Sequence, residues 1–296
     1  MNKKVPAQPG TMSDRDNPVI IMAMGRSGST LLMRLINCSP DIMVWGEHNG
    51  FLTAFGRAFH ALTCTFATDC MRNSERFTEV VLNQQPIILS RGERWSCEWV
   101  NAFTKSDVLS AFRKLIVDLL ARRVPEGVRW GFKEIRYHGE EIELLRTLFP
   151  RAQFILLLRN PVHVLQSISR HFTRGDPKRT MQTMLRYLDF LALVQKQLEH
   201  KRQDVLVSHY ELLLESPEEQ LSRLEQFLGT SFARPNCEAI LSERKKLREP
   251  PADVHSELAA FVETSRLPID PGKVLVLADQ YRTLLNAART PQTVAT

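Results

Sequence analysis

A short segment rich in hydrogen-bond donors is the first part of the sequence in which chemistry can be expected. It combines two glycines, three hydroxyl side chains and one arginine: Gly25, Arg26, Ser27, Gly28, Ser29 and Thr30. The apolar run 19–24 precedes it, and an apolar-periodic stretch, 31–37, follows it. A glycine-containing turn from a buried strand into a helix presents backbone N–H groups that suit an anion such as phosphate. The alternative is an ordinary tight turn between two elements.

This segment differs from the Walker A phosphate loop at one decisive position. That motif needs a lysine directly after its second glycine, whereas Ser29 follows Gly28 here. The other strongly apolar run, 153–158, is followed by Arg159 and not by a magnesium-binding aspartate. The pattern therefore predicts a phosphate site that works without a metal ion, for a donor that transfers a less charged group than ATP does.

Three separate motifs resemble one family. The segment 26–32, Arg-Ser-Gly-Ser-Thr-Leu-Leu, resembles the 5′-phosphosulfate loop of the sulfotransferases, which use 3′-phosphoadenosine 5′-phosphosulfate (PAPS). Arg159 and Ser167 resemble that family's 3′-phosphate site. The segment 208–212 resembles its Tyr-Glu-Asp-Leu stretch, with Leu212 in place of the aspartate. The resemblance covers the ranges 19–52, 128–172 and 204–229.

The form of the loop also resembles particular branches of the family. An Arg-Ser-Gly-Ser-Thr loop followed by Gly-Glu is typical of the tyrosylprotein and bacterial carbohydrate branches, and Gly46-Glu47 stands at the matching place. The Pro-Lys-Ser-Gly loop and catalytic histidine of the steroid and phenol branch are not apparent. The resemblance implies PAPS as co-substrate, adenosine 3′,5′-bisphosphate as product and no metal.

Glu47 is the predicted general base, because it follows a short apolar run and an acceptor hydroxyl needs help to lose its proton. We expect burial to raise its pKa toward the working pH. His48 is the neighbouring rival, and the alternative for Glu47 is a surface or helix-capping carboxylate. Arg26 and Lys133 are predicted to stabilise the negative charge that develops as the sulfuryl group leaves. The alternative for Lys133 is a solvated lysine at a strand end.

The adenosine end of the donor is assigned to residues from the second half of the sequence. Arg159 is predicted to pair with the 3′-phosphate in a bidentate way and Ser167 to donate a hydroxyl to it. Tyr210 is expected to lie near the adenosine or to be a core tyrosine. Arg170 and Arg174 fall on the helix face of Ser167, and Arg170 is offset by one position from the family's arginine. The basic run 244–248 either closes over the nucleotide or is an exposed charged helix.

The elements that must position these residues alternate along the chain. Strands are predicted at 19–24, 42–45, 128–135, 153–158 and 204–207, with helices between them. Asn160 and Pro161 are a cap and a first helical residue, for a helix that should run to about Phe172. Ser106 is expected to cap a helix that buries a stripe including Leu115 and Leu119. Ser216 is expected to open a capping box.

Alternating strands and helices predict an α/β fold. It is a three-layer αβα domain around a mainly parallel sheet of about four or five strands, which the resemblance identifies as the P-loop-like sulfotransferase fold. Because ligands of parallel sheets bind at the carboxyl ends of the strands, the residues just after each strand should meet. The expected domain is 18–289, with loose tails at 1–17 and 290–296. A helical insertion at 50–127 should carry acceptor specificity.

Composition excludes several classes of protein. The 296 residues are 43% hydrophobic and 24% charged, with a net charge of +6, as in an ordinary globular protein. No apolar run approaches the length that spans a bilayer, so no membrane span is expected. The cysteines lack a metal-ligand or disulfide pattern, so we expect reduced thiols in a cytoplasmic protein: Cys38, Cys64, Cys70, Cys97 and Cys237.

Two other functions remain as alternatives. A phosphoryl transferase on the same loop would need ATP and Mg²⁺. A non-catalytic protein that binds a nucleotide or a nucleic acid would use the basic helix face, but the basic stretches lack interleaved aromatic residues, so no nucleic-acid partner is expected. The acceptor is a hydroxyl compound whose class (sugar, peptide tyrosine, lipid or small metabolite) the sequence does not specify, and neither does it specify the oligomeric state.

Overall fold

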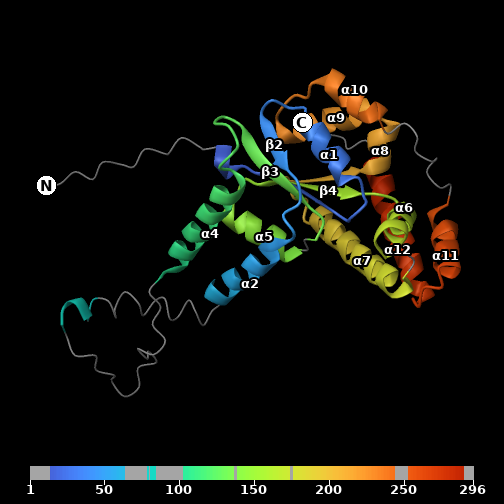
Figure 1. Cartoon of the computed structure of the whole chain (residues 1–296), viewed down its shortest axis with the longest axis horizontal. Helices are drawn as coiled ribbons and strands as arrows, with labels where there is room; N and C mark the ends of the chain where they lie inside the picture. Colours follow the sequence, from blue (N-terminus) through green and yellow to red (C-terminus); the bar gives the residue numbers. More distant parts are fainter. Residues whose placement is uncertain are drawn as a thin grey trace, which may run out of the picture.

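The computed structural model describes residues 14–63, 79, 81–84, 103–136, 139–173, 176–243 and 253–289. Within them a five-stranded sheet runs in the order β2-β3-β1-β4-β5, and every neighbouring pair is parallel (Figure 1). The strands are β1 (Val19–Ala23), β2 (Ile42–Trp45), β3 (Arg129–Glu134), β4 (Gln153–Leu158) and β5 (Val205–His209). The predicted sheet is confirmed, and the apolar runs of β1 and β4 are buried along nearly their whole length, as expected for central strands covered on both faces.

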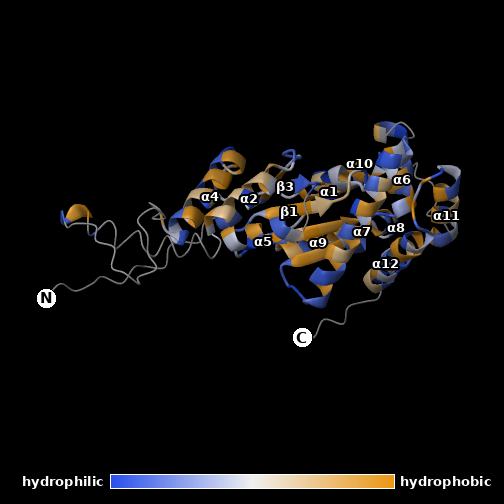
Figure 2. Ribbon diagram, turned by 90° about the horizontal axis from the view of Figure 1, so that it is seen from below, coloured by the Kyte–Doolittle hydropathy of each residue, from blue (hydrophilic) through white to orange (hydrophobic). Residues whose placement is uncertain are grey.

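Helices cover both faces of the sheet. One face packs against α1 (Ser29–Ile36), α8 (Tyr210–Glu215), α9 (Pro217–Leu228) and α10 (Arg234–Ser242). The other packs against α2 (Phe51–Thr63), α4 (Lys105–Leu120), α5 (Gly139–Leu148), α6 (Pro161–Ile168), α7 (Pro177–Glu199), α11 (Val254–Thr264) and α12 (Pro271–Arg289). Most helix ribbons alternate between hydrophobic and hydrophilic colours in Figure 2, as expected for helices with one buried face. The predicted three-layer αβα architecture is therefore confirmed.

The central strand β1 shows why the two layers form. Its side chains alternate between the two cores: Ile20 and Met22 belong to one, and Val19, Ile21 and Ala23 to the other. All five residues are at most 3% exposed. A strand that is apolar at every position can be accommodated only between two helical layers, which places its carboxyl end at the centre of the sheet's edge.

Several local predictions are corrected by the structure. Thr104, and not Ser106, caps α4, in a capping box with Asp107. Leu115 and Leu119 are 42% and 59% exposed, so the buried stripe of this helix is narrower than predicted. Ser216 precedes α9 but makes no side-chain cap hydrogen bond.

The helix after Arg159 is also shorter than expected. It ends at Ile168, and a π-helical turn, η3 (Ser169–Thr173), follows. The α-helical spacing that put Arg170 on the face of Ser167 therefore does not hold at Arg170.

Some predictions fall outside the described residues. These are the two tails up to residue 13 and from 290 on, the basic run 244–248, Arg174, and the cysteines Cys64, Cys70 and Cys97. Cys38 and Cys237 are free thiols. The bounds of the domain and the acceptor role of 50–127, to which α2 and α4 belong, stay predictions.

Candidate active site

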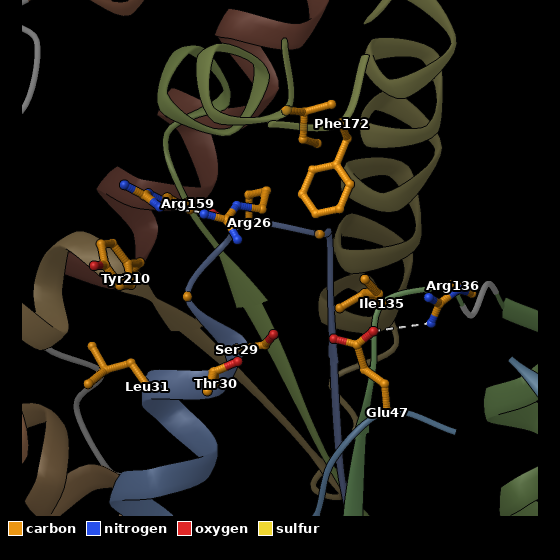
Figure 3. A pocket seen from close by; sticks show the side chains of 13 residues that line it. Arg26, Ser29, Thr30, Leu31, Glu47, Ile135, Arg136, Arg159, Phe172 and Tyr210 are labelled. Carbon is orange, nitrogen blue, oxygen red and sulfur yellow. Dashed lines mark hydrogen bonds and ion pairs between the residues drawn. The ribbon is translucent and has the colours of Figure 1, made fainter. Parts of the chain in front are cut away.

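The carboxyl ends of the strands meet around a cavity of about 430 Å³. It is lined from β1 by the loop 25–30, from β2 by Glu47, from β4 by Arg159 and from β5 by Tyr210 (Figure 3). Of the loop, Gly25, Arg26, Gly28, Ser29 and Thr30 line it. The sheet thus brings together residues from four separate parts of the sequence, as the prediction from parallel strands requires.

The loop has a conformation that few residues adopt. Arg26 has a φ of 67° and Gly28 a φ of 93°, so two left-handed residues stand within three positions. A non-glycine residue held there costs about 1–3 kcal/mol and persists only where its surroundings fix it. Here the guanidinium of Arg159 donates to the carbonyl oxygen of Arg26 at 2.8 Å. Strain of this kind clusters at binding and active sites.

Ser27 differs from the other hydroxyl residues of the loop. It is fully buried, and its hydroxyl donates to the carbonyl oxygen of Met24 at 2.6 Å. Its backbone N–H donates to the same oxygen at 3.2 Å. Ser27 therefore has no donor left for an anion and acts by closing the turn. Ser29 and Thr30, at the first turn of α1, line the cavity instead.

Gly28 is required by its contact with Tyr210. A Cβ atom on Gly28 would lie 2.2 Å from Cδ2 of that ring, inside van der Waals contact. The same ring packs under the Arg159 guanidinium, whose central carbon lies 4.4 Å from the ring centroid. Tyr210 is thus a wall of the cavity shared by the loop and Arg159.

Arg159 is fixed by buried groups that the sequence analysis did not single out. Its carbonyl oxygen accepts a hydrogen bond from the Tyr187 hydroxyl. The next backbone N–H, that of Asn160, donates to Glu211 at 2.8 Å, and the Tyr281 hydroxyl donates to the same carboxylate at 2.9 Å. Burial raises the pKa of Glu211 above its ordinary value. These partners come from α7, α8 and α12, and sequence spacing alone cannot place such distant elements.

A second pair of predicted residues is in direct contact. Arg26 Nε donates to Ser167 Oγ at 3.0 Å, which joins the loop to α6. The Arg26 guanidinium also lies 5.7 Å from the centroid of Phe172, a 63% exposed ring in the π-helical turn. Phe172 lines the cavity beside Arg26 of the loop (Figure 3). Sequence reasoning treated it only as the end of a helix.

Glu47 is held between two cations. Lys133 Nζ lies 2.6 Å from Oε1 of this carboxylate, and an Arg136 nitrogen lies 3.2 Å from Oε2 (Figure 3 shows the second pair). The Lys133 side chain is only 7% exposed, and that of Glu47 is 31% exposed. The predicted base and the predicted second cation are thus ion-paired, and Arg136 joins them without having been predicted.

The ion pairs reverse the expected titration of Glu47. Burial does raise the pKa of this carboxyl, but the hydrogen bond and charge of Lys133, with those of Arg136, outweigh it. The pKa therefore lies below its ordinary value. The expectation of a raised pKa was wrong, because the sequence did not show two cations meeting at one carboxylate.

His48 occupies a different position from Glu47. Its ring Nδ1 lies 2.8 Å from the carbonyl oxygen of Gly46, and its ring lies near Phe132, with 5.6 Å between centroids. It lines a neighbouring cavity with Trp45 and Arg122, not the one around the loop. This geometry favours Glu47 over His48 as the group that faces a bound donor.

The comparisons with known proteins show the family of this chain. The sequence matches the model of the Sulfotransferase family over residues 18–234. The match spans more than half of the chain, so this protein belongs to the sulfotransferase family and is a sulfotransferase enzyme. A relative from Caenorhabditis briggsae, named "Putative protein-tyrosine sulfotransferase", is 21% identical over 226 residues, which are 75% of this chain and 69% of the relative.

Solved structures with similar folds are also sulfotransferases. The sulfotransferase domain of the Synechococcus PCC 7002 olefin synthase has a TM-score of 0.47 at 21% identity, over 94% of this chain and 91% of that one. Mouse sulfotransferase SULT7A1, complexed with PAP, has a TM-score of 0.41 at 14% identity, over 79% and 68%. No described helix is both long and apolar enough to cross a membrane.

Proposed function

We propose that this sulfotransferase moves the sulfuryl group of PAPS to an acceptor hydroxyl, with Glu47 as the general base. One observation carries the proposal: a single cavity holds the donor-rich loop after β1, Arg159 after β4 and Glu47 after β2. These are a cradle for the 5′-phosphosulfate, a cation for the 3′-phosphate and a base for the acceptor. In the strand order β2-β3-β1-β4-β5, the loop after β1 lies between Glu47 after β2 and Arg159 after β4.

The residues present fit the donor. Backbone N–H groups at the start of α1, with Ser29 and Thr30, suit the 5′-phosphosulfate. The Nε atom of Arg159 is buried and has no hydrogen-bond partner among the described residues, so this guanidinium can take a further acceptor. A phosphate oxygen fits that role because arginine binds phosphate in a bidentate way. Ser167 would add its hydroxyl.

The transfer itself is an in-line displacement. The acceptor oxygen forms a bond to sulfur, and the bond from sulfur to the 5′-phosphate oxygen breaks, leaving its electron pair on that oxygen. The acceptor proton passes to the Glu47 carboxylate. Arg26 and Lys133 offset the negative charge that grows on the leaving oxygen. The products are a sulfate ester and adenosine 3′,5′-bisphosphate, and most of the rate enhancement comes from positioning and electrostatics.

Because Lys133 pairs with Glu47, binding of the donor should also change how basic Glu47 is. A carboxylate whose pKa is held low is a weak base, and Lys133 is the largest cationic influence on Glu47. Lys133 must turn toward the phosphosulfate to stabilise the leaving oxygen, and this movement loosens its contact with Glu47. Donor binding therefore makes Glu47 more basic just when the acceptor hydroxyl has to lose its proton. The site needs no metal ion for this chemistry.

The acceptor is proposed only as a hydroxyl compound. Tyrosine peptides belong in a first screen because the Caenorhabditis briggsae relative is named as a protein-tyrosine sulfotransferase. Sugars, lipids and small metabolites belong there as well, since 21% identity does not select an acceptor.

Thermal unfolding of the purified chain with added nucleotides tests the donor site. Adenosine 3′,5′-bisphosphate should raise Tm by several degrees at a large excess over its Kd, because a ligand that binds only the folded state stabilises it. Arg159→Ala should abolish the shift, whereas Arg151→Ala, an exposed arginine before β4, should keep it. No shift, or a larger one with ATP and Mg²⁺ than with the bisphosphate, would contradict the proposal and favour phosphoryl transfer. Salt-sensitive binding of single-stranded nucleic acid alone would favour a non-catalytic binding protein.

A further inference from the structure

Glu134, the last residue of β3, is a buried carboxylate that the mechanism above does not use. It is fully buried, although it lies between Lys133 and the cavity-lining Ile135 in sequence. Neighbouring side chains of a strand point to opposite faces. Glu134 therefore reaches the segment around Glu47 from a different side than Lys133 does.

Four donors converge on this carboxylate. Its Oε2 accepts from the backbone N–H groups of His48 at 3.3 Å and Gly50 at 2.7 Å. Its Oε1 accepts from the N–H of Ile135 at 2.9 Å and from the Arg136 guanidinium at 2.7 Å. An ionised carboxylate is the side chain that offers this many acceptor sites and no donor.

The turn that Glu134 binds has an unusual backbone. Asn49 and Gly50 both have positive φ, of 58° and 67°. In this turn the backbone N–H groups of His48 and Gly50 point to the same side and form a concavity that suits an anion. Glu134 fills the concavity, and the turn begins directly after Glu47. The conformation of the turn and the direction of the Glu47 side chain are therefore linked through one buried group.

Arg136 connects the same carboxylate to the base. The same guanidinium nitrogen lies 2.7 Å from Glu134 and 3.2 Å from Glu47, so the buried group fixes the arginine that pairs with the base. Glu134 thus acts on Glu47 by two routes, through the turn and through Arg136.

We propose that Glu134 is the positioning residue that holds the Glu47 carboxylate toward the cavity. This inference rests on the proposed function, in which Glu47 is the base. The competing explanation is that Glu134 only stabilises the turn between β2 and α2. Glu141 of α5 offers a matched control, because it is also buried, at 3% exposure, and accepts from the Thr53 hydroxyl of α2 at 2.6 Å.

The experiment compares Glu134→Gln and Glu141→Gln with the wild-type chain. For each we would measure Tm, the Kd of adenosine 3′,5′-bisphosphate, and kcat and KM for transfer from PAPS to the first acceptor found. Glu134→Gln should lower kcat about 10- to 100-fold, because a misplaced catalytic group costs that much, with a Kd that changes about threefold or less. Glu141→Gln should lower Tm with kcat unchanged. Equal kcat for wild type and Glu134→Gln, or an equal loss in Glu141→Gln, would overturn the inference.

Two further measurements keep the test decisive. Glu134→Asp keeps an acceptor-only carboxylate, so it should recover part of the lost kcat, and it replaces the glutamine variant if that one does not fold.

The titration of the Glu47 carboxyl carbon by NMR needs no acceptor. Removal of the Glu134 charge would by itself lower the pKa of Glu47. If Glu134 positions Glu47, the contacts of Glu47 with Lys133 and Arg136 are lost in Glu134→Gln, and its pKa should rise toward the ordinary value. An unchanged or lowered pKa would overturn the inference. A wild-type chain without transfer or bisphosphate binding would instead contradict the proposed function, whatever the NMR titration shows.

Discussion

At the scale of single residues, the three cationic side chains assigned to the site each contact another residue of the site. Arg26 contacts Ser167, Lys133 contacts Glu47, and the Arg159 guanidinium contacts the carbonyl oxygen of Arg26. Such pairing keeps long cationic side chains in place, which lowers the entropic cost of ordering them when a ligand binds. A donor with two charged ends can then replace these contacts one by one.

The ion pairs of Glu47 predict a pH dependence. A base must be deprotonated to act, and its lowered pKa puts the acidic limb of kcat/KM for the donor below about pH 4.5, the ordinary range of a glutamate. Arg136→Met removes one cation, so the pKa of Glu47 rises and this limb should move to higher pH by about one unit or less. Rate measurements over a pH series check the shift.

The 3′-phosphate of the donor also titrates, so it can add its own limb to the pH profile of kcat/KM. Because this limb is the same for wild type and Arg136→Met, comparing the two enzymes separates it from the limb of Glu47. A phosphate monoester has a second pKa of about 6. A limb that wild type and Arg136→Met show at the same pH therefore belongs to the 3′-phosphate. Only the difference between Arg136→Met and wild type reports on Glu47. A limb that moved to lower pH in the variant would contradict the assignment of Glu47 as the base.

Sequence reasoning located most of the site residues but not how they act. The loop 25–30, Glu47, Arg159 and Tyr210 all follow apolar runs, so the rule for parallel sheets predicts their meeting. The Ser27 hydroxyl bonds to the Met24 carbonyl oxygen and not to the cavity, and this orientation depends on a local backbone conformation that residue types do not specify. The contacts of Arg136 and Glu134 depend on how the turn after Glu47 folds over β3, which no periodicity encodes.

At the scale of elements, the close approach of β1 and β3 determines where the loop and Lys133 stand relative to each other. Gly131 of β3 faces Val19 of β1 in the register of this pair. A Cβ atom on Gly131 would lie 2.2 Å from the backbone carbonyl oxygen of Val19. Because the neighbour is backbone and not a flexible side chain, the contact cannot be relieved locally.

Gly131→Ala should therefore destabilise the protein strongly. Overpacking of this kind costs about 1–3 kcal/mol or more, which corresponds to a drop in Tm of several degrees. Gly56→Ala in α2 is the control, since its Cβ would meet only a Leu144 methyl carbon at 3.7 Å. That change should be neutral or stabilising, by about 0.5–1 kcal/mol, because alanine favours a helix interior. Similar Tm values for the two variants would contradict the packing argument.

The elements themselves show what periodicity can and cannot predict. All five strands of the described sheet were predicted, and the signal was clearest for β1 and β4, whose apolar runs are buried on both faces. The start of α4 was placed at Ser106, whereas the structure caps it at Thr104, because both are hydroxyl residues and only the geometry decides between them. The end of α6 could not be predicted, since a π-helical turn has no distinct sequence signal.

At the scale of the whole molecule, helix α12 packs against β5, at the side of the sheet where the adenosine site is proposed. Tyr281 of this helix reaches the Glu211 carboxylate, and its ring lies 6.1 Å from that of His209, at the end of β5. Figure 1 shows α12, in red, beside α6 and α7. A segment far from the loop in sequence thus completes the support of Arg159.

His209 makes this region sensitive to acid. Burial, with the charges of Arg223 and Arg289, lowers the pKa of His209 to about 3. In the unfolded chain the imidazole takes up a proton near about pH 6.5, so the unfolded state binds more protons between these two values. The free energy of unfolding must therefore fall as the pH drops through that window.

The measurement is Tm as a function of pH for wild type and His209→Phe. The variant has no group to titrate, so its Tm should fall less steeply between about pH 6.5 and pH 4, by several degrees. The raised pKa of Glu211 acts in the opposite direction, and it is common to both proteins. His60→Gln, at an exposed position on α2, is the control and should show the same dependence of Tm on pH as wild type. Parallel curves for wild type and His209→Phe would contradict a neutral, buried His209.

The most direct test of the whole account is the Glu47→Gln variant, assayed for donor binding and transfer together. Calorimetry should give a Kd for adenosine 3′,5′-bisphosphate within about threefold of wild type, because Glu47 does not hold the nucleotide. Transfer of labelled sulfur from PAPS to the acceptor should slow by about 10²- to 10⁴-fold, the contribution of a general base. Turnover at the wild-type rate would contradict the account and point to another base, with His48 the first to examine.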